Sequence, residues 1–399
     1  MKNEMTKRER MMCALSGGIP DRVPCAPDIS YMVPCRLTGK PFYEVLMNAN
    51  PPLWKAYIDA VDYFDIDGWF TYGWISPVSK IEYTLRSQKF IDEKGRWNLA
   101  SEYDTPAGVL RQVNCYFERD SDTPVEKLIK DFKEDFPKIK YLFPKIDSVD
   151  TALYDEQKKA LGEKGIMCVG CFPPGFQIYN MYFHGNVEAI TYAYYDESEL
   201  FEEFTELYAQ YTLRYLELIL EHKPDSILTG GSGSITLQSP EIFDTLSLPF
   251  IKKATKMCKQ ACVISGIHSC GKEMHLIKRC AEETELNYVN PLELPPMGDC
   301  TIAEARKVAG SKLALMGNLH TTKTMLKGTV REVETAALEA IAAGAANGGF
   351  VLSTGDQCGR DTPDENIRAM VRIAKEFGKY PLDIKRLNSE LSKTTLAIR

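Results

Sequence analysis

Short runs of apolar residues recur along the chain, and each is followed by a polar or glycine-containing turn and then by an amphipathic stretch. The eight runs are Val23–Pro27, Asp67–Tyr72, Ile166–Phe172, Ser226–Thr229, Cys262–His268, Leu286–Asn290, Leu313–Gly317 and Phe350–Thr354. Apolar runs of this length, bounded by turn residues, are typical of strands that are buried on both faces. Eight such strands in alternation with helices predict an α/β fold, namely a (β/α)8 TIM barrel.

The predicted helices carry recognisable start signals. Capping boxes, in which Thr is followed three residues later by Glu, begin at Thr6, Thr301 and Thr329. Thr362-Pro363 places a proline at the first position of a further helix, and Ser239-Pro240 opens another, which Pro249 is expected to interrupt. These signals place helices between the predicted strands, as a barrel requires.

The stretch between Trp74 and Ile166 is too long for a single connecting helix. Four segments in it are rich in strand-forming residues and are joined by turns: Ile81–Thr84, Lys89–Ile91, Trp97–Leu99 and Val109–Phe117. They predict a β-hairpin insertion after the second barrel strand, at about residues 75–125, followed by a charged helix over Thr123–Glu134. No shift in composition marks a domain boundary, so residues 1–399 are predicted to form a single TIM-barrel domain with this insertion.

Composition narrows the class of protein. The net charge of -7 and the scattering of lysine and arginine argue against a nucleic acid or an anionic membrane as partner. No apolar run is long enough to span a membrane, and residues 1–18 lack a signal-peptide core, so we expect a cytoplasmic protein. The twelve cysteines are then expected to be free thiols or metal ligands rather than a disulfide framework.

In a TIM barrel the reactive groups follow the strands, and the fifth predicted strand ends in Ile267-His268-Ser269-Cys270. Residues two apart in an extended segment point the same way, so His268 and Cys270 are both expected to face the barrel mouth. Imidazole nitrogen and thiolate sulfur are good ligands for zinc. The alternative is a buried histidine that is hydrogen-bonded to backbone beside a packed cysteine.

Further candidate groups follow the last and the sixth strands. The glycine-rich loop after Phe350–Thr354 contains Asp356 and Cys358, either of which completes a three-ligand zinc site. Glu293 follows the sixth strand and is a candidate ligand or an acid–base group. The alternative for the loop is a turn that is capped by Asp356, with Cys358 packed beneath it.

Two segments are candidates for contact with an organic substrate. The run after the third strand is rich in aromatic residues, and Phe176, Tyr179, Asn180 and Tyr182 in it could wall a pocket for a flat ligand. The alternative is that these aromatic residues form the core face of a helix. After the seventh strand, Asn318 is placed to hydrogen-bond a substrate.

Several segments resemble the uroporphyrinogen decarboxylase superfamily. They are MTKRERMMCALSGGIPDRVPCAPD, PPGFQIYNMYFHGNVEAITYAYYDESEL, ALMGNLH with the following LKGTVREVE, and GGFVLSTGDQCGRDTPDENIRAM. The resemblance spans nearly the whole chain and implies the barrel of that superfamily. The stretch PDISYMVPCRLTG lacks the arginine-rich MRQAGR-like motif of the decarboxylases, which argues against porphyrinogen chemistry.

The other branch of the superfamily comprises zinc-dependent methyltransferases that exchange methyl groups with a corrinoid protein. Their zinc motif is His-x-Cys with a distant Cys near the last strand, so the resemblance implies His268, Cys270 and Cys358 as metal ligands. In the thiol-methylating members the last cysteine stands about two residues earlier, where this chain has Asp356. The third ligand is therefore Cys358, Asp356 or Glu293.

This branch implies transfer of a methyl group from a small substrate to a corrinoid (cobalamin). The departure at Asp356 and the aromatic run favour a methoxylated aromatic donor, with zinc as a Lewis acid and Asp356 or Glu293 protonating the leaving oxygen. The chain lacks the DxHxxG corrinoid signature, so the corrinoid is expected on a separate partner protein. A methylcobamide:thiol methyltransferase, a metal-free decarboxylase and a catalytically silent binding barrel remain alternatives. Homodimerisation is compatible with the resemblance.

Overall fold

A parallel sheet of seven strands forms the centre of the molecule in a computed structural model that describes residues 4–396. In sheet order the strands are β1 (Gly68–Gly73), β8 (Gly165–Gly170), β9 (Ser226–Leu228), β10 (Ile264–His268), β11 (Tyr288–Asn290), β12 (Ala314–Leu319) and β13 (Phe350–Thr354). The sheet curls, and its strands correspond to seven of the eight runs predicted from the sequence. Those seven predictions are confirmed.

The remaining run, Val23–Pro27, lies beside the sheet without forming a regular strand. Cys25 makes an isolated parallel bridge with Leu352 of β13, and the Ala26 N–H donates to the Leu352 carbonyl at 2.9 Å. On its other side, the Asp67 N–H donates to the Cys25 carbonyl at 2.9 Å. Pro24 and Pro27 have no backbone N–H, which explains why the ladder is interrupted here.

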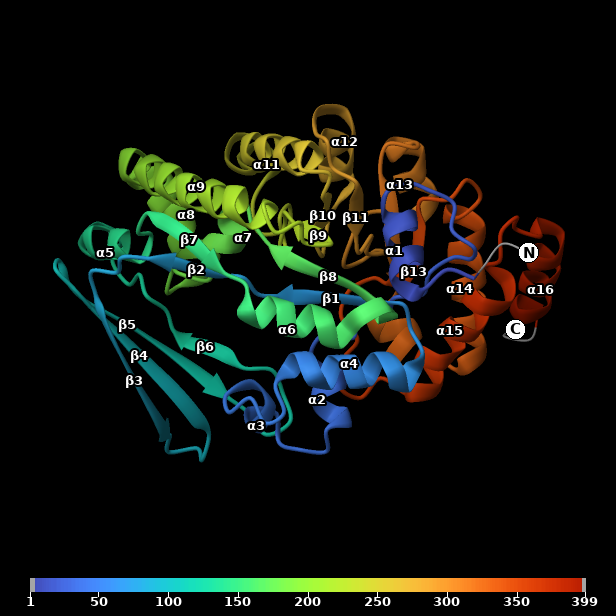
Figure 1. Cartoon of the computed structure of the whole chain (residues 1–399), viewed down its shortest axis with the longest axis horizontal. Coiled ribbons are helices and arrows are strands. Elements are labelled where there is room, and N and C mark those ends of the chain that lie inside the picture. The colour runs from blue at the N-terminus through green and yellow to red at the C-terminus, as the bar shows by residue number, and fades with distance from the viewer. Residues whose placement is uncertain (1–3, 397–399) are drawn as a thin grey trace.

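Helices surround the curled sheet, and most of them cover its outer side (Figure 1). They are α1 (Lys7–Leu15), α2 (Met32–Leu37), α3 (Phe42–Leu46), α4 (Leu53–Phe64), α5 (Phe132–Ile139), α6 (Ala152–Leu161), α7 (Phe176–Tyr179), α8 (Asn186–Asp196), α9 (Ser198–Leu220), α10 (Pro240–Ile242), α11 (Leu248–Gln260), α12 (Met274–Glu283), α13 (Ile302–Ala309), α14 (Val330–Gly344), α15 (Asp364–Phe377) and α16 (Ile384–Leu396). Within residues 4–396, no helix is long and apolar enough to cross a membrane.

The helix starts follow the sequence signals closely. The capping boxes at Thr6, Thr301 and Thr329 are all formed, with the threonine hydroxyl and the glutamate three residues later each accepting a backbone hydrogen bond. Pro363 stands one position before the first residue of α15, at the N-cap position instead of the first helical position. Pro249 lies in the first turn of α11, directly after a π-helical turn at Phe243–Ser247 that follows α10.

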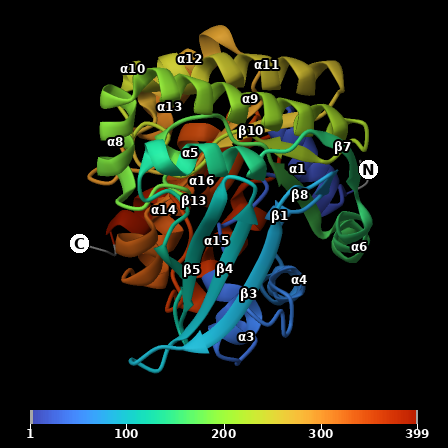
Figure 2. The ribbon, with the colours of Figure 1, turned by 90° about the vertical axis from the view of Figure 1, so that its left-hand side faces the viewer.

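Antiparallel strands occupy most of the long connection between β1 and β8. A four-stranded sheet is formed by β3 (Thr84–Ile91), β4 (Trp97–Thr105), β5 (Gly108–Tyr116) and β6 (Thr123–Glu126), and β2 (Ser76–Ser79) pairs with β7 (Ile146–Asp150). Figure 2 shows β3, β4 and β5 in front of the end of the parallel sheet at which β1 and β8 finish. The four-stranded sheet therefore flanks the mouth of the curled sheet.

Two expectations for this region are wrong. Ile81 to Tyr83 precede β3 instead of forming a strand, although Thr84 begins β3. The helix expected over Thr123–Glu134 is replaced by β6 and a later helix: Thr123 pairs with Cys115 of β5, and α5 starts at Phe132 after the Asp131 cap. The strand-forming Thr-Pro-Val stretch thus pairs with an available sheet edge, which outweighs the charge pattern that suggested a helix.

The interior of the curled sheet is filled from its N-terminal end by α1. Met11, Ala14 and Leu15 of this helix are buried together with side chains from the strands, among them Trp69 and Tyr288. The Tyr288 ring lies against Gly266 of the neighbouring strand, where an added Cβ would come within 2.0 Å of it. Glycine is therefore required at position 266, because only its bare backbone leaves room for the ring.

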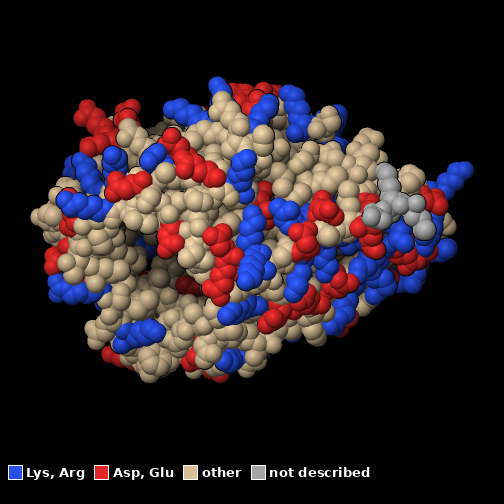
Figure 3. Space-filling model, in the orientation of Figure 1, with Lys and Arg blue, Asp and Glu red and all other residues tan. Residues whose placement is uncertain are grey.

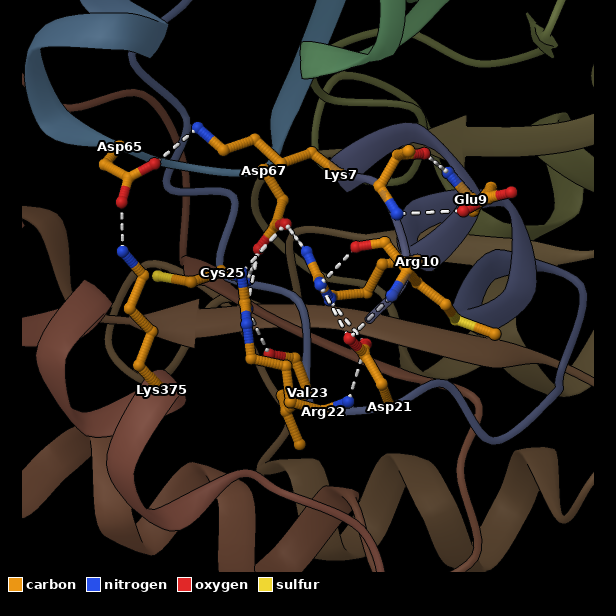
Figure 4. A network of polar contacts seen from close by, with 12 residues as sticks. Lys7, Glu9, Arg10, Asp21, Arg22, Val23, Cys25, Asp65, Asp67 and Lys375 are labelled. Atoms are coloured by element: carbon orange, nitrogen blue, oxygen red, sulfur yellow. Dashed lines mark hydrogen bonds and ion pairs between the residues drawn. The ribbon is translucent and has the colours of Figure 1, made fainter. Parts of the chain in front are cut away.

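Asp67, directly before β1, is the centre of a buried ionic network at this N-terminal end (Figure 4). Its carboxylate is fully buried and accepts from Arg10 at 2.7 Å, from Arg22 at 2.9 Å and from the Cys25 N–H at 2.8 Å. Arg10 also reaches Asp21. One carboxylate thus ties α1 and the Val23–Pro27 segment to the start of β1.

We expect replacement of Asp67 by Asn to destabilise the fold strongly. Two buried guanidinium groups would lose their shared counter-charge, and breaking a buried pair in this way costs roughly 3–5 kcal/mol. Asp65 is a matched control, because it also pairs with two lysines, Lys7 and Lys375, but is 58% exposed. D65N should cost at most about 1 kcal/mol. Urea unfolding of both variants measures the difference, and equal losses would contradict a special role for Asp67.

Candidate metal centre

His268 is the last residue of β10, and its imidazole is held by the neighbouring strand. Asn290, the last residue of β11, pairs with His268 in the sheet register. The side-chain oxygen of Asn290 lies 2.6 Å from Nδ1 of His268, while the Asn290 amide donates to the Met316 carbonyl at 3.3 Å. An accepting oxygen at Nδ1 selects the neutral tautomer that has its proton on Nδ1 and its lone pair on Nε2. A histidine fixed in this way is prepared for metal binding through Nε2.

The structure brings Cys270 and Asp356 to this nitrogen. One possible ligand atom from each of His268, Cys270 and Asp356 lies within 4.8 Å of the others, and Asp356 Oδ1 is 3.7 Å from His268 Nε2. Cys270 follows the end of β10, and Asp356 follows the end of β13. These two strands are not neighbours, because β11 and β12 lie between them in the sheet. The loop after β13 is turned inward, with the Thr354 hydroxyl donating to the Asp356 carbonyl at 2.7 Å.

The three side chains offer nitrogen, sulfur and oxygen, a donor set that suits zinc and leaves a fourth position open. Burial raises the pKa of the Cys270 thiol to about 12, and the negative charge of Asp356 adds to this increase. A thiol in such surroundings needs a nearby cation to hold its anionic form. The group therefore has the chemistry of a metal centre, and a divalent cation fits it.

Glu293 supports the loop that carries Cys270. It is 8% exposed, and its carboxylate accepts a hydrogen bond from the Gly271 N–H. The Glu293 N–H in turn donates to the carboxylate of Glu273, which is fully buried, at 3.2 Å. Burial raises the pKa of both carboxyl groups. Glu293 is not among the side chains that line the cavity beside the metal centre.

Cys358 lies apart from the three grouped side chains. It is fully buried in the hydrophobic core, and its N–H donates to the Asp28 carbonyl at 2.7 Å. The group that could hold a metal contains Asp356 in its place. Two residues of chain beyond Asp356 are enough to carry the backbone from the mouth of the sheet back into the core.

A cavity of about 510 Å3 opens above His268 and Asp356. Its lining includes the aromatic side chains of Tyr72, Trp74 and Phe172, and also Asp28. Figure 3 shows the surface hollowed on the side where β1 and β8 end, with acidic and basic side chains interspersed around it. The three candidate ligands, His268, Cys270 and Asp356, here called the metal group, thus lie beside a cavity of a size that suits a small organic molecule.

The aromatic run after β8 contributes to the core rather than to this cavity. Phe176, Tyr179 and Tyr182 pack in a cluster with residues of α9, such as Phe204. Gln177, Ile178 and Met181 from the same run line the cavity instead. Phe176, Tyr179 and Tyr182 thus do not form the expected aromatic pocket wall, because the single turn of α7 and the turn after it direct these rings against α9.

The two asparagines proposed for substrate contact are engaged elsewhere. Asn180 accepts hydrogen bonds from Lys127 through its backbone and side-chain oxygens. Asn318 is buried, and its amide donates to the Leu292 carbonyl at 3.0 Å. Neither residue lines the cavity above the metal group.

Sequence reasoning missed Asp28, Tyr72, Trp74 and Phe172 as cavity residues. All four stand at or just after the ends of predicted strands, where the reactive groups of a barrel collect. Applying that rule to the first three strands, as to the later ones, would have found them.

Comparison with known proteins identifies the class. The family described as uroporphyrinogen decarboxylase (URO-D) matches residues 157–377, which is more than half of the chain. The chain belongs to this family. The matched segment includes His268, Cys270 and Asp356, and the predicted resemblance to the superfamily is confirmed.

The chain is also similar to proteins named as methylcobamide:CoM methyltransferases. It is 26% identical over 195 residues to methylcobamide:CoM methyltransferase MtaA of Methanosarcina barkeri, covering 45% of this chain and 50% of that protein. It is 24% identical over 170 residues to methylcobamide:CoM methyltransferase MtbA of Methanosarcina mazei, covering 42% of this chain and 47% of that protein. The matches thus span about half the length of these relatives.

A solved structure supports the fold over a longer range. A methyltransferase from Methanosarcina mazei superposes with a TM-score of 0.65 and covers 94% of this chain and 99% of its own. The sequence identity is 16%, so this likeness concerns the fold alone.

Two substitutions in the aromatic run after β8 test which of its side chains lie in the core. We expect F176A to destabilise the protein by about 3–5 kcal/mol, because it empties a buried aromatic site. M181A, on the same segment but 65% exposed, should change stability by less than about 0.5 kcal/mol. Thermal and urea unfolding measure both, and a mild F176A variant would contradict the core position of that ring.

Proposed function

We propose that this protein is a zinc-dependent methyltransferase that moves a methyl group from a small methoxylated aromatic to the corrinoid of a separate protein. The observation that carries the proposal is the group of His268, Cys270 and Asp356 at an aromatic-lined cavity. Membership of the URO-D family and similarity to proteins named as methylcobamide:CoM methyltransferases support methyl transfer as the reaction.

We assign zinc to His268, Cys270 and Asp356, and we assign Cys358 to the core. The donor atoms, their separation and the Asn290 contact that frees Nε2 of His268 support this ligand set. When bound, zinc supplies Lewis-acid chemistry, which makes a phenolate a better leaving group. His268, Cys270 and Asp356 would hold the ion beside the cavity.

The methyl donor is proposed to lie between the metal group and the aromatic side chains of the cavity. In the reaction, the bond between the methyl carbon and the ether oxygen breaks, and cobalt(I) of the partner's corrinoid receives the methyl group. The oxygen keeps the electron pair of that bond and takes up a proton. Asp356 does not supply this proton while it binds the metal as an anion, and Glu293 supports the Cys270 loop, so the proton comes from solvent that reaches the cavity.

We further propose that the fold is a complete (β/α)8 barrel in a single domain. The hydrogen bonds of Val23–Pro27 to β13 and to Asp67 support this segment as the eighth member of the ring. The antiparallel sheet β3–β6 is then an insertion after the second barrel strand.

All twelve cysteines are free, which supports a cytoplasmic, reducing location.

A methylcobamide:thiol methyltransferase is the second candidate, and the names of the relatives favour it. In that reaction a substrate thiol, rather than an ether, would approach the metal. Assays with each type of substrate separate the two: release of a phenol from a methoxyarene supports the first, and methylation of a thiol by methylcobalamin supports the second.

Metal content tests the ligand set. We expect about one zinc per chain in protein purified without chelators, and a marked loss in H268A and C270S. D356N should bind zinc more weakly, because a neutral amide replaces an anionic ligand. C358S should retain its zinc and is the control. Zinc loss in C358S together with retention in D356N would contradict the assignment.

The contact between Asn290 and His268 should tune metal affinity. Removing the partner that orients a ligand histidine typically weakens metal binding by about 10–100-fold, and we expect this of N290A. Asn287 is a matched control in the segment before β11, because its side chain accepts from the Ser265 N–H and not from His268. Competition with a chelating dye measures zinc affinity in both variants, and equal affinities would argue against the proposed role of Asn290.

A further inference from the structure

The cavity beside His268 and Asp356 has more acidic than basic side chains in its lining. Asp28 and Asp356 both line it, and His268 is the one basic side chain in the lining. Among the described residues that form this lining there is neither lysine nor arginine. A divalent ion held by Cys270 and Asp356 would be neutralised by those two anionic ligands, which would leave Asp28 as the acidic side chain of the lining without a cationic partner.

Asp28 is positioned so that one carboxylate oxygen is free to meet a ligand. The residue is 5% exposed, and its Oδ1 accepts from the Ser30 hydroxyl at 2.6 Å and from the Ser30 N–H at 3.1 Å. Within residues 4–396, the hydrogen bonds to this carboxyl group reach Oδ1 and leave Oδ2 without one. Burial raises the pKa of Asp28, whereas the nearby His268 and the two hydrogen bonds from Ser30 lower it and favour the carboxylate.

The remaining walls suit an uncharged aromatic ring. Tyr72, Trp74 and Phe172 offer ring faces, and Ile178 and Met181 add apolar surface. A bound carboxylate would lose its hydration here and would meet Asp28 without a positive partner, which is costly. A phenolic hydroxyl, by contrast, can donate a hydrogen bond to the free oxygen of Asp28.

We propose that the cavity selects uncharged methoxyphenols and rejects methoxylated aromatic acids, with Asp28 as the specificity-determining residue. The identity of the ligand as a methyl ether rests on the function proposed above, whereas the selection by charge rests on the cavity itself. In this arrangement the substrate hydroxyl donates to Asp28 Oδ2, and the methoxy group points toward His268 and Asp356.

Binding to the purified full-length chain tests the selection without requiring turnover. Calorimetry would compare methoxyphenol, methoxybenzoate and methoxybenzamide. Each compound would be tested as its ortho, meta and para isomer. The amide has nearly the shape of the benzoate but no charge, so this pair separates charge from size. We expect the best methoxyphenol and the best methoxybenzamide to bind at least about tenfold more tightly than any methoxybenzoate.

Replacing Asp28 by Asn tests the residue, because Asn keeps the acceptor for Ser30 and removes the negative charge. We expect D28N to reduce the preference for amide over benzoate to less than about threefold. D59N, an exposed change on α4, should keep the wild-type preference. Thermal unfolding establishes whether D28N is folded. If D28N does not fold, the comparison of amide and benzoate binding to the wild-type protein still tests the selection by charge.

The binding results distinguish a failure of the selection by charge from a failure of the proposed function. Benzoate binding as tight as the amide in the wild type would overturn the selection by charge, whether or not methyl transfer occurs. Failure of every ring to bind would overturn the cavity as a methoxyarene site. Selective binding of the uncharged rings without any methyl transfer to a corrinoid would support the inference and reject the proposed function instead.

Discussion

Strands that run parallel in one sheet all end at the same edge, and the candidate site depends on this constraint. His268 ends β10 and Asn290 ends β11, so the sheet register alone brings the imidazole to the amide that orients it. The loop after β13 adds Asp356 to the same edge. At the opposite end, the buried Asp67 carboxylate ties α1 and the Val23–Pro27 segment to β1. The buried ionic network and the candidate site therefore lie at opposite ends of the sheet, and barrels typically separate stability from function in this way.

Much of the fold was accessible from sequence because its signals are local. Buried strands gave continuous apolar runs, and capping boxes such as Thr301 with Glu304 marked helix starts by their own hydrogen bonds. Signals that depend on a distant partner were missed. The stretch from Thr123 becomes a strand because β5 offers it an edge, and β2 exists only through its pairing with β7, about 70 residues away in sequence.

The candidate site was predicted in part for the same reason. His268 and Cys270 share one extended segment, so their spacing predicts that they act together. The choice between Asp356 and Cys358 depends on how a loop folds back, which spacing does not reveal. Phe176 and Tyr179 were assigned to a pocket by composition, whereas the single turn of α7 places them against α9. The aromatic character of the cavity comes instead from Tyr72 and Trp74 at the end of β1 and from Phe172 just after β8.

The most direct test of the proposed metal centre is X-ray absorption at the zinc edge of the zinc-loaded, full-length protein. Zinc–sulfur bonds of about 2.3 Å are readily separated from zinc–nitrogen and zinc–oxygen bonds of about 2.0–2.2 Å. A site made by His268, Cys270 and Asp356 predicts a single sulfur ligand among lighter atoms. Two sulfur ligands would bring Cys358 or another cysteine into the site and would contradict the assignment, as would a protein that binds no zinc.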